Sequence, residues 1–227
     1  MCVGDIATDE GRYEPLGAPV YWIHGNNDNF DAIANRDLPP DLRYVANGTA
    51  VDVGRVSDVG RVSDVGRVSD VGRVFRPGDR DARSGDHLRV AGLGGTFAPT
   101  WYDTPAVDLP HPKKGSARAT ELADKRRHFV REQVEAAKAL RGVDILLTHE
   151  AAKPFRPFPG GRGPDAGKSQ INEVLQAMQP RLHLFGHHHR FSEQEREGVR
   201  SVGLDLVTRS YLLIKRPSLD YEFHGTA

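Results

Sequence analysis

Short apolar segments that end in glycine or polar residues are the feature that most constrains the fold of this chain. Four such segments occupy residues 19–24, 88–93, 143–148 and 181–185. They are too short for helices and rich in β-forming residues, so each is predicted to be a strand. Candidate helices lie between them, and this alternation predicts an α/β layered fold.

Two amphipathic segments are the candidate helices. The first, at about residues 120–140, carries its apolar residues on one face and is followed by Gly142, a stop signal. The second, at about residues 169–178, has Pro180 beyond its end. Its inward residues are predicted to be Ile171, Val174, Leu175 and Met178.

The run Lys125-Arg126-Arg127 within the first candidate helix has two readings. It could contact nucleic acid, or it could form the solvated face of an amphipathic helix. The chain has 31 basic and 31 acidic residues and a formal net charge of zero, so no global field favours nucleic acid or membrane. The solvated face is therefore the favoured reading.

Length and composition favour one soluble domain. The 227 residues are 38% hydrophobic and 27% charged, which is ordinary for a globular protein, and we expect a single domain over residues 1–227. Cys2 has no internal disulfide partner, and the chain shows neither a signal peptide nor an apolar run of membrane-spanning length. A cytoplasmic location is the resulting expectation.

A low-complexity segment interrupts this domain. The hexapeptide at residues 53–58 recurs at 59–64 and 65–70 and breaks off at 71–74. Left-handed β-helices need more coils than this to bury a core, so a surface loop or hairpin is favoured. We expect residues 53–87 to be an insert.

Three consecutive histidines follow the last predicted strand. Residues 182–185 run through Gly186 into His187, His188 and His189. Neutral imidazole is the commonest metal ligand in proteins. If extended geometry continues past Gly186, His187 and His189 point the same way and His188 points the other way.

Three further segments also present metal-ligand side chains after glycine or a short apolar run. They are Gly4-Asp5, Gly25-Asn26 and Thr148-His149. Ligands of layered α/β sheets bind at the carboxyl ends of strands, so these side chains and the histidine run are predicted to meet. A purely structural histidine cluster would require this order to be coincidental.

In the order and type of these motifs the chain resembles the calcineurin-like metallophosphoesterase superfamily, over nearly its whole length. That family's motifs are Asp-x-His, Gly-Asp, Gly-Asn-His-Asp/Glu, a lone His and Gly-His-x-His. The resemblance implies an α-β-β-α sandwich. Residues 93–97, residues 148–150 and the histidine run look closest to the branch that includes RNA lariat debranching enzymes.

The resemblance also implies the ligand set of two divalent ions. Asp5 would bridge them; Asn26, His149 and His187 would complete the shell of one ion, and His189 would bind the other. Mn, Fe, Zn or Ni suits such donors. The family reaction implied is hydrolysis of a phosphomonoester or phosphodiester by metal-activated hydroxide, with either a small molecule or a nucleotide or RNA as the phosphate-ester substrate.

The chain departs from the family pattern in two places. Asn27 stands where most relatives have a histidine that protonates the leaving alkoxide, and an amide is no useful proton donor. Asp28 stands where the family has an acidic residue that orients this histidine. The Asp-x-His motif is also absent, since only three residues precede Gly4-Asp5. The first strand is therefore expected to be missing, and a non-catalytic fold that binds one metal, a phosphate ligand or a protein partner is the alternative.

Overall fold

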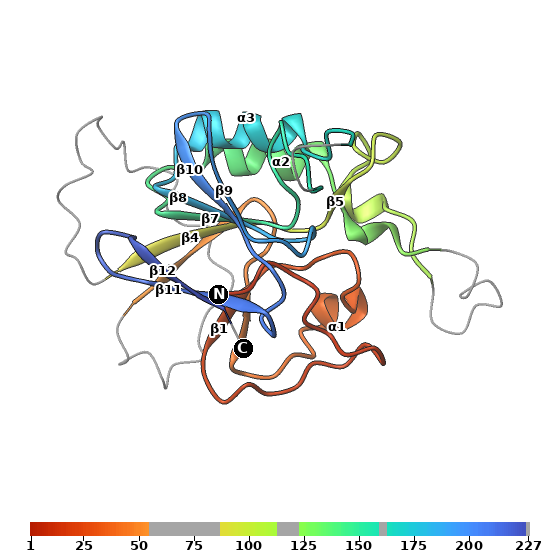
Figure 1. Cartoon of the computed structure of the whole chain (residues 1–227). Coiled ribbons are helices and arrows are strands. Elements are labelled where there is room, and N and C mark those ends of the chain that lie inside the picture. Colours follow the sequence, from red (N-terminus) through yellow and green to blue (C-terminus); the bar gives the residue numbers. More distant parts are fainter. Residues whose placement is uncertain (55–86, 113–122, 159–162, 226–227) are drawn as a thin grey trace.

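A six-stranded mixed sheet forms the centre of the described structure, which comprises residues 1–54, 87–112, 123–158 and 163–225 of a computed structural model (Figure 1). The strand order is β3 (Thr49–Val53), β4 (Leu88–Leu93), β7 (Ile145–Thr148), β8 (Leu182–Phe185), β10 (Val199–Gly203) and β9 (Ser192–Arg196). The four central strands are parallel, and β3 and β9 pair antiparallel at the edges. The carboxyl ends of β4, β7 and β8 therefore lie at one edge of the sheet.

Three two-stranded pairs accompany the central sheet. β1 (Val20–Trp22) runs parallel to β2 (Leu42–Tyr44). Cys2, which precedes both strands in the chain, forms a parallel bridge with Trp22. β5 (Thr96–Phe97) pairs with β6 (His128–Phe129), and β11 (Ser210–Ile214) forms a hairpin with β12 (Tyr221–Gly225). All four strands predicted from the sequence are present; β4 has the predicted bounds, and the other three are shorter than predicted.

Helices α2 (Arg131–Ala139) and α3 (Ser169–Met178) lie side by side on one face of the central sheet (Figure 1). Alternation along the strands sends one set of side chains toward these helices. This first core is made of Ala91, Leu93, Leu146, Val134, Ala137, Ile171, Val174, Leu175 and Met178, among others.

The opposite face of the sheet packs against the β1–β2 pair and the β11–β12 hairpin (Figure 1). The alternate side chains of the same strands point there and form a second core with Val3, Ile23, Val45 and Leu219. The short helix α1 (Phe30–Asn35) follows β1 and has no buried residue. Two stacked β layers with helices outside them confirm the predicted α/β layered fold.

The two predicted helices have different outcomes. α3 has the predicted bounds and buries the four predicted residues, and it ends at Gln179, whose φ of 49° is left-handed. The prediction of one helix over 120–140 is confirmed for residues 131–139 and was wrong for residues 125–129. Residues 125–127 form a 3-10 turn and residues 128–129 form β6, because Phe129 is buried against β5 in extended backbone; α2 begins only at Arg131.

The repeat lies between two strands that are antiparallel neighbours. Val53, at the end of β3, is opposite Leu88, at the start of β4. Residues 55–86, which contain most of the predicted insert, are outside the described residues.

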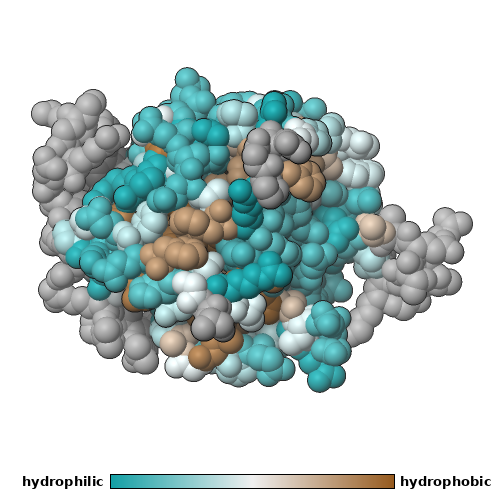
Figure 2. Space-filling view, viewed as in Figure 1, coloured by the Kyte–Doolittle hydropathy of each residue, from teal (hydrophilic) through white to brown (hydrophobic). Residues whose placement is uncertain are grey.

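Figure 2 shows a mainly hydrophilic face with an apolar group over the β11–β12 hairpin. Alternation explains it, because Leu212 and Ile214 face the second core while Tyr211, Leu213 and Phe223 are 44–50% exposed. None of the helices in the described part of the chain has the length and apolar character needed to span a bilayer.

Candidate metal centre

Two glycines allow the segment around Asp5 to approach the loop after β1. Gly4 has a φ of 110°, and a Cβ there would lie 2.6 Å from the Gly25 nitrogen and 2.6 Å from His149 Nδ1. A Cβ on Gly25 would overlap the Asp5 carboxylate. The absence of both side chains brings the Asp5 carboxylate to the edge where β7 and β8 end.

Asp28 holds these two segments together. Its carboxylate is 6% exposed and accepts hydrogen bonds from four backbone N–H groups, those of Gly25 (2.7 Å), Asp5 (2.9 Å), Ile6 (3.2 Å) and Ala7 (3.2 Å). Burial raises the pKa of Asp28, while these donors act to lower it. The contacts of Asp28 are thus those of a positioning residue.

His149 lies at the centre of the candidate site and is buried. Its Nδ1 is 2.8 Å from the Val3 carbonyl, which can only accept, so Nδ1 carries a proton, and in the neutral imidazole Nε2 has the lone pair. Three donor atoms surround this Nε2: Asn26 Oδ1 at 3.0 Å, His187 Nδ1 at 3.1 Å and Asp5 Oδ2 at 3.6 Å. Four of the five predicted metal ligands therefore meet.

The chemistry of these donors fits one divalent ion. In the neutral form of His149, both its Nε2 and Asn26 Oδ1 are hydrogen-bond acceptors. Their lone pairs repel each other unless a cation lies between them. Ligand atoms about 2.1 Å from a common ion lie roughly 3.0–3.4 Å apart at octahedral or tetrahedral angles. Burial, followed by the nearby His149, lowers the pKa of His187 to about 4, so His187 is neutral near pH 7.

The amide of Asn26 is a necessary part of this set. Among the described residues, no group of three or more His, Cys, Asp and Glu side chains is arranged to hold a metal ion. Asp5 and His187 are each near His149, and Asn26 supplies the remaining oxygen. Such a set matches a single site with nitrogen and oxygen ligands.

Asn27 lies against Asp5. Its backbone nitrogen donates to Asp5 Oδ1 at 2.8 Å, and its side-chain Nδ2 is 3.4 Å from Asp5 Oδ2. The side chain is exposed and borders the donor cluster. It can donate a hydrogen bond there but not a proton.

The histidine run does not continue the β8 strand. His187 and His189 have φ values of 66° and 46°, and the nitrogen of His188 donates to the Gly186 carbonyl at 2.7 Å. The condition for His187 and His189 to point the same way is therefore not met. His189 is exposed, and no hydrogen bond or ion pair joins it to the other four predicted ligands.

His188 packs behind the cluster. Its ring centroid is 4.6 Å from that of Phe155, and burial lowers its pKa to about 4. This agrees with a structural place for His188. Glu150, the residue after His149, also has structural contacts. Its carboxylate accepts a hydrogen bond from the Phe97 nitrogen at 2.6 Å and forms an ion pair with Lys168 at 3.2 Å.

A polar hollow of about 370 Å³ borders the cluster. Its lining residues are Asn26, Asn27, Asp28, Asn29, Phe30, Asp31, Asp124, Arg126 and Arg127. The two arginines were read from the sequence as part of a solvated helix face, which the 3-10 turn at residues 125–127 contradicts. In the sequence, the basic run itself was the signal that these arginines could bind a ligand. Only the fold places them beside Asn26.

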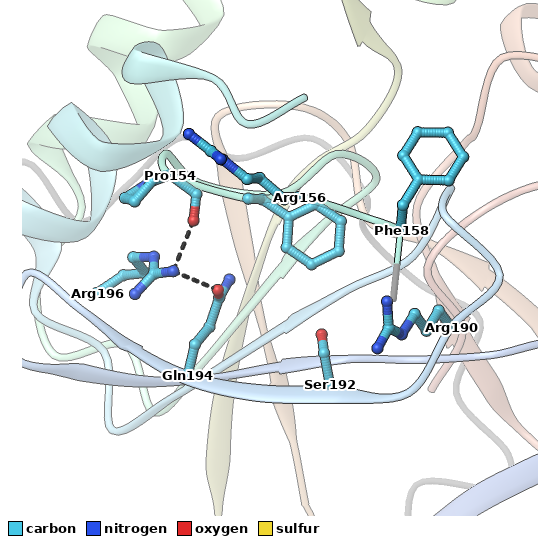
Figure 3. A pocket seen from close by; sticks show the side chains of 8 residues that line it. Pro154, Arg156, Phe158, Arg190, Ser192, Gln194 and Arg196 are labelled. Carbon is cyan, nitrogen blue, oxygen red and sulfur yellow. Dashed lines mark hydrogen bonds between the residues drawn. The ribbon is translucent and has the colours of Figure 1, made fainter. Parts of the chain in front are cut away.

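A larger hollow, of about 430 Å³, lies between residues 154–158 and strand β9 (Figure 3). Arg196 donates to the Pro154 carbonyl at 2.6 Å and to Gln194 at 2.5 Å, and Arg190 donates to the Pro157 carbonyl at 2.6 Å. These guanidinium groups bind the chain's own oxygens. None of the predicted site residues lines this hollow, so the candidate site is the smaller one.

The fold and the donor cluster together define a layered α/β protein with a candidate metal site at the carboxyl ends of its strands. The chain belongs to the calcineurin-like phosphoesterase family, whose model matches residues 2–191. The resemblance seen in the sequence is confirmed at the level of this family.

Solved structures are similar to this chain at low sequence identity. One crystal structure has a TM-score of 0.54 and 11% identity, with 93% of this chain and 67% of that chain covered. GAP50, the anchor in the inner membrane complex of Plasmodium, has a TM-score of 0.39 and 14% identity; 91% of this chain is covered, and the match spans 55% of the GAP50 chain. No curated protein sequence matches the chain. At 11% identity the first structure supports the fold alone.

Proposed function

We propose that this protein is a metal-dependent phosphoesterase with one principal metal site, held by Asp5, Asn26, His149 and His187. The observation that carries the proposal is the convergence of three donor atoms within 3.6 Å of His149 Nε2. When bound, a divalent ion supplies positive charge to a phosphate group and acidifies water. The family reaction, hydrolysis of a phosphate ester, is the activity that such a site supports.

The protein's own groups have separate tasks in this proposal. The Val3 carbonyl fixes the tautomer of His149, and Asp28 holds the segments that carry Asp5 and Asn26. Asn27 offers an amide where the family has a proton donor. General acid catalysis is typically worth about 10²–10⁴-fold, so we expect aryl esters, whose alcohol leaves unaided, to be hydrolysed far better than alkyl esters.

The test compares purified protein with two variants. Wild-type protein supplied with Mn²⁺ should hydrolyse bis(p-nitrophenyl) phosphate or p-nitrophenyl phosphate, and Asp5→Ala and His187→Ala should lose turnover and metal binding. His189→Ala is the matched control within the same histidine run. It should keep the principal metal, whereas its predicted role at a second ion would appear as the loss of a weaker, second equivalent.

A non-catalytic role is the second candidate, and the amide at Asn27 favours it. In that case the protein binds one ion and a phosphate ester without hydrolysing it. Metal uptake and phosphate affinity without turnover of any aryl ester would support this candidate against the first. The absence of both metal uptake and turnover in wild-type protein would contradict the phosphoesterase proposal.

A further inference from the structure

Two neighbouring arginines, Arg126 and Arg127, line the hollow beside Asn26, and their guanidinium groups have different partners. Arg126 contacts two carboxylates, Asp124 at 2.5 Å and Asp31 at 2.6 Å. Arg127 instead donates from Nε and Nη2 to the backbone carbonyl of Asn26, at 3.0 and 2.6 Å. No ion pair joins Arg127 to the described residues, so its positive charge is not neutralised there.

The hollow is lined by one more carboxylate than guanidinium groups, but these charged groups differ in their partners. Asp31 and Asp124 pair with Arg126. The Asp28 carboxylate is buried and is directed at backbone N–H groups. Arg127 therefore differs from the other charged lining residues. It has neither an ion-pair partner among them nor the backbone hydrogen bonds that surround the Asp28 carboxylate. Attraction for an anionic group is therefore local to the Arg127 guanidinium and does not come from the net charge of the lining.

The local fold holds Arg127 firmly beside the donor cluster. Asp124 begins the 3-10 turn by accepting from the Arg126 nitrogen at 2.9 Å, and His128, the next residue after Arg127, is paired with β5. The same residue, Asn26, presents its side-chain oxygen to His149 and its carbonyl to Arg127. Asn26 therefore links the Arg127 guanidinium to the donor cluster.

We propose that Arg127 is the phosphate-binding residue of this site, and that it takes the non-bridging oxygens of the phosphate group in the hollow beside Asn27. The planar guanidinium has N–H groups left over after its contact with Asn26, and its fork geometry matches phosphate oxygens. Arg127 supplies charge and hydrogen bonds rather than a proton. Its role in hydrolysis rests on the proposed function, whereas its role in anion binding does not.

Phosphate affinity tests the inference without any need for turnover. Inorganic phosphate is titrated calorimetrically into wild-type protein loaded with Mn²⁺ and into Arg127→Ala, Arg127→Lys and Lys125→Ala. Charge-assisted hydrogen bonds lead us to expect about a 10- to 100-fold weaker affinity in Arg127→Ala and an intermediate loss in Arg127→Lys, which keeps the charge without the fork. Lys125→Ala removes one positive charge from the same turn and should stay within about twofold of wild type.

The affinity for Mn²⁺ in the same variants separates binding from positioning. Because Arg127 also holds the Asn26 carbonyl, a merely structural role would weaken Mn²⁺ and phosphate binding together. We expect Mn²⁺ affinity to change by less than about threefold. The inference is overturned if wild-type protein does not bind phosphate, if Arg127→Ala binds it as well as Lys125→Ala does, or if Mn²⁺ affinity falls in parallel.

Hydrolysis measurements keep this inference apart from the proposed function. If aryl esters are turned over, Arg127→Lys should raise KM more than it lowers kcat. If wild-type protein does not turn over any ester but its phosphate affinity depends on Arg127, the proposed function fails and the phosphate-binding role of Arg127 stands.

Discussion

Asp5 and Asp28 are both acidic residues of the candidate site, but their carboxylates face different groups. Asp5 is directed at His149 and Asn27, in the donor cluster, whereas Asp28 is buried among backbone N–H groups. A carboxylate surrounded by N–H donors contributes to stability through charge-assisted hydrogen bonds and positions whatever those segments carry. At the residue scale, Asp28 thus supports the segment that carries the Asp5 carboxylate.

Asp28→Asn tests this division. The new NH₂ group would face backbone N–H donors, so at least one of them would lose its acceptor while staying buried. We expect the free energy of unfolding to fall by about 1–3 kcal/mol, together with weaker Mn²⁺ binding. Urea unfolding and metal titration measure the two effects. Asp37→Asn, at an exposed position near the end of α1, should change stability by less than about 0.5 kcal/mol; equal behaviour of the two variants would contradict the support role.

Three neighbouring parallel strands of the central sheet are joined by a buried polar chain. His183 on β8 contacts Thr148 Oγ1 on β7 at 2.8 Å and Ser201 Oγ on β10 at 3.0 Å. Both ring nitrogens are therefore satisfied in the neutral form. Burial lowers the pKa of His183 from 6.5 to about 3. At the element scale, the interior of the sheet depends on an imidazole that must stay uncharged.

The stability of the protein should accordingly fall as the pH falls below about 6.5. The unfolded chain takes up a proton at His183 near pH 6.5, whereas the folded chain does so only near pH 3, so acid favours the unfolded state. One such residue costs about 1.4 kcal/mol per pH unit in this window. Urea unfolding between pH 7.5 and 4.5 should show the fall, and His183→Gln should make it shallower, with His24 retaining a similar contribution. An unchanged slope in His183→Gln would show that another group accounts for the acid sensitivity.

The donor cluster unites four distant parts of the chain. Asp5, Asn26, His149 and His187 follow four different segments, and they meet where the second β layer touches the edge of the central sheet. An ion bound by all four would link both β layers. At the scale of the whole molecule, metal binding and folding should therefore be coupled, because the unfolded chain lacks this arrangement.

Added Mn²⁺ should stabilise the wild-type protein against urea. Linkage predicts about 2.7 kcal/mol when the free metal is 100 times its dissociation constant. His187→Ala should lose most of this gain, whereas His189→Ala should retain it. Parallel metal analysis should give one tightly bound equivalent per chain. Equal stabilisation of wild type and His187→Ala would place the ion elsewhere.

Local patterns predicted the parallel strands that precede the site and helix α3. The bounds and buried face of α3 follow from apolar spacing and from Pro180, and the four predicted strands follow from short apolar runs with polar ends. The region before α2 was different. Phe129 has the spacing of a helical residue, yet its burial against Phe97 on β5 favours extended backbone, and this partner is 32 residues away in the chain. Propensity cannot anticipate such a contact.

The sequence by itself determined the family and the types of donor, because glycine, carboxylate, amide and imidazole side chains occur in a diagnostic order along it. Only the tertiary structure decided which of them meet. His187 contacts His149 while His189 stays exposed, and the chain after Gly186 enters left-handed backbone instead of continuing as a strand. The structure also distinguished Arg127 from Arg126, because their partners come from residues about a hundred positions away. Residue types are local properties of a chain, but the direction in which a side chain points and the charge beside it arise from packing between distant segments.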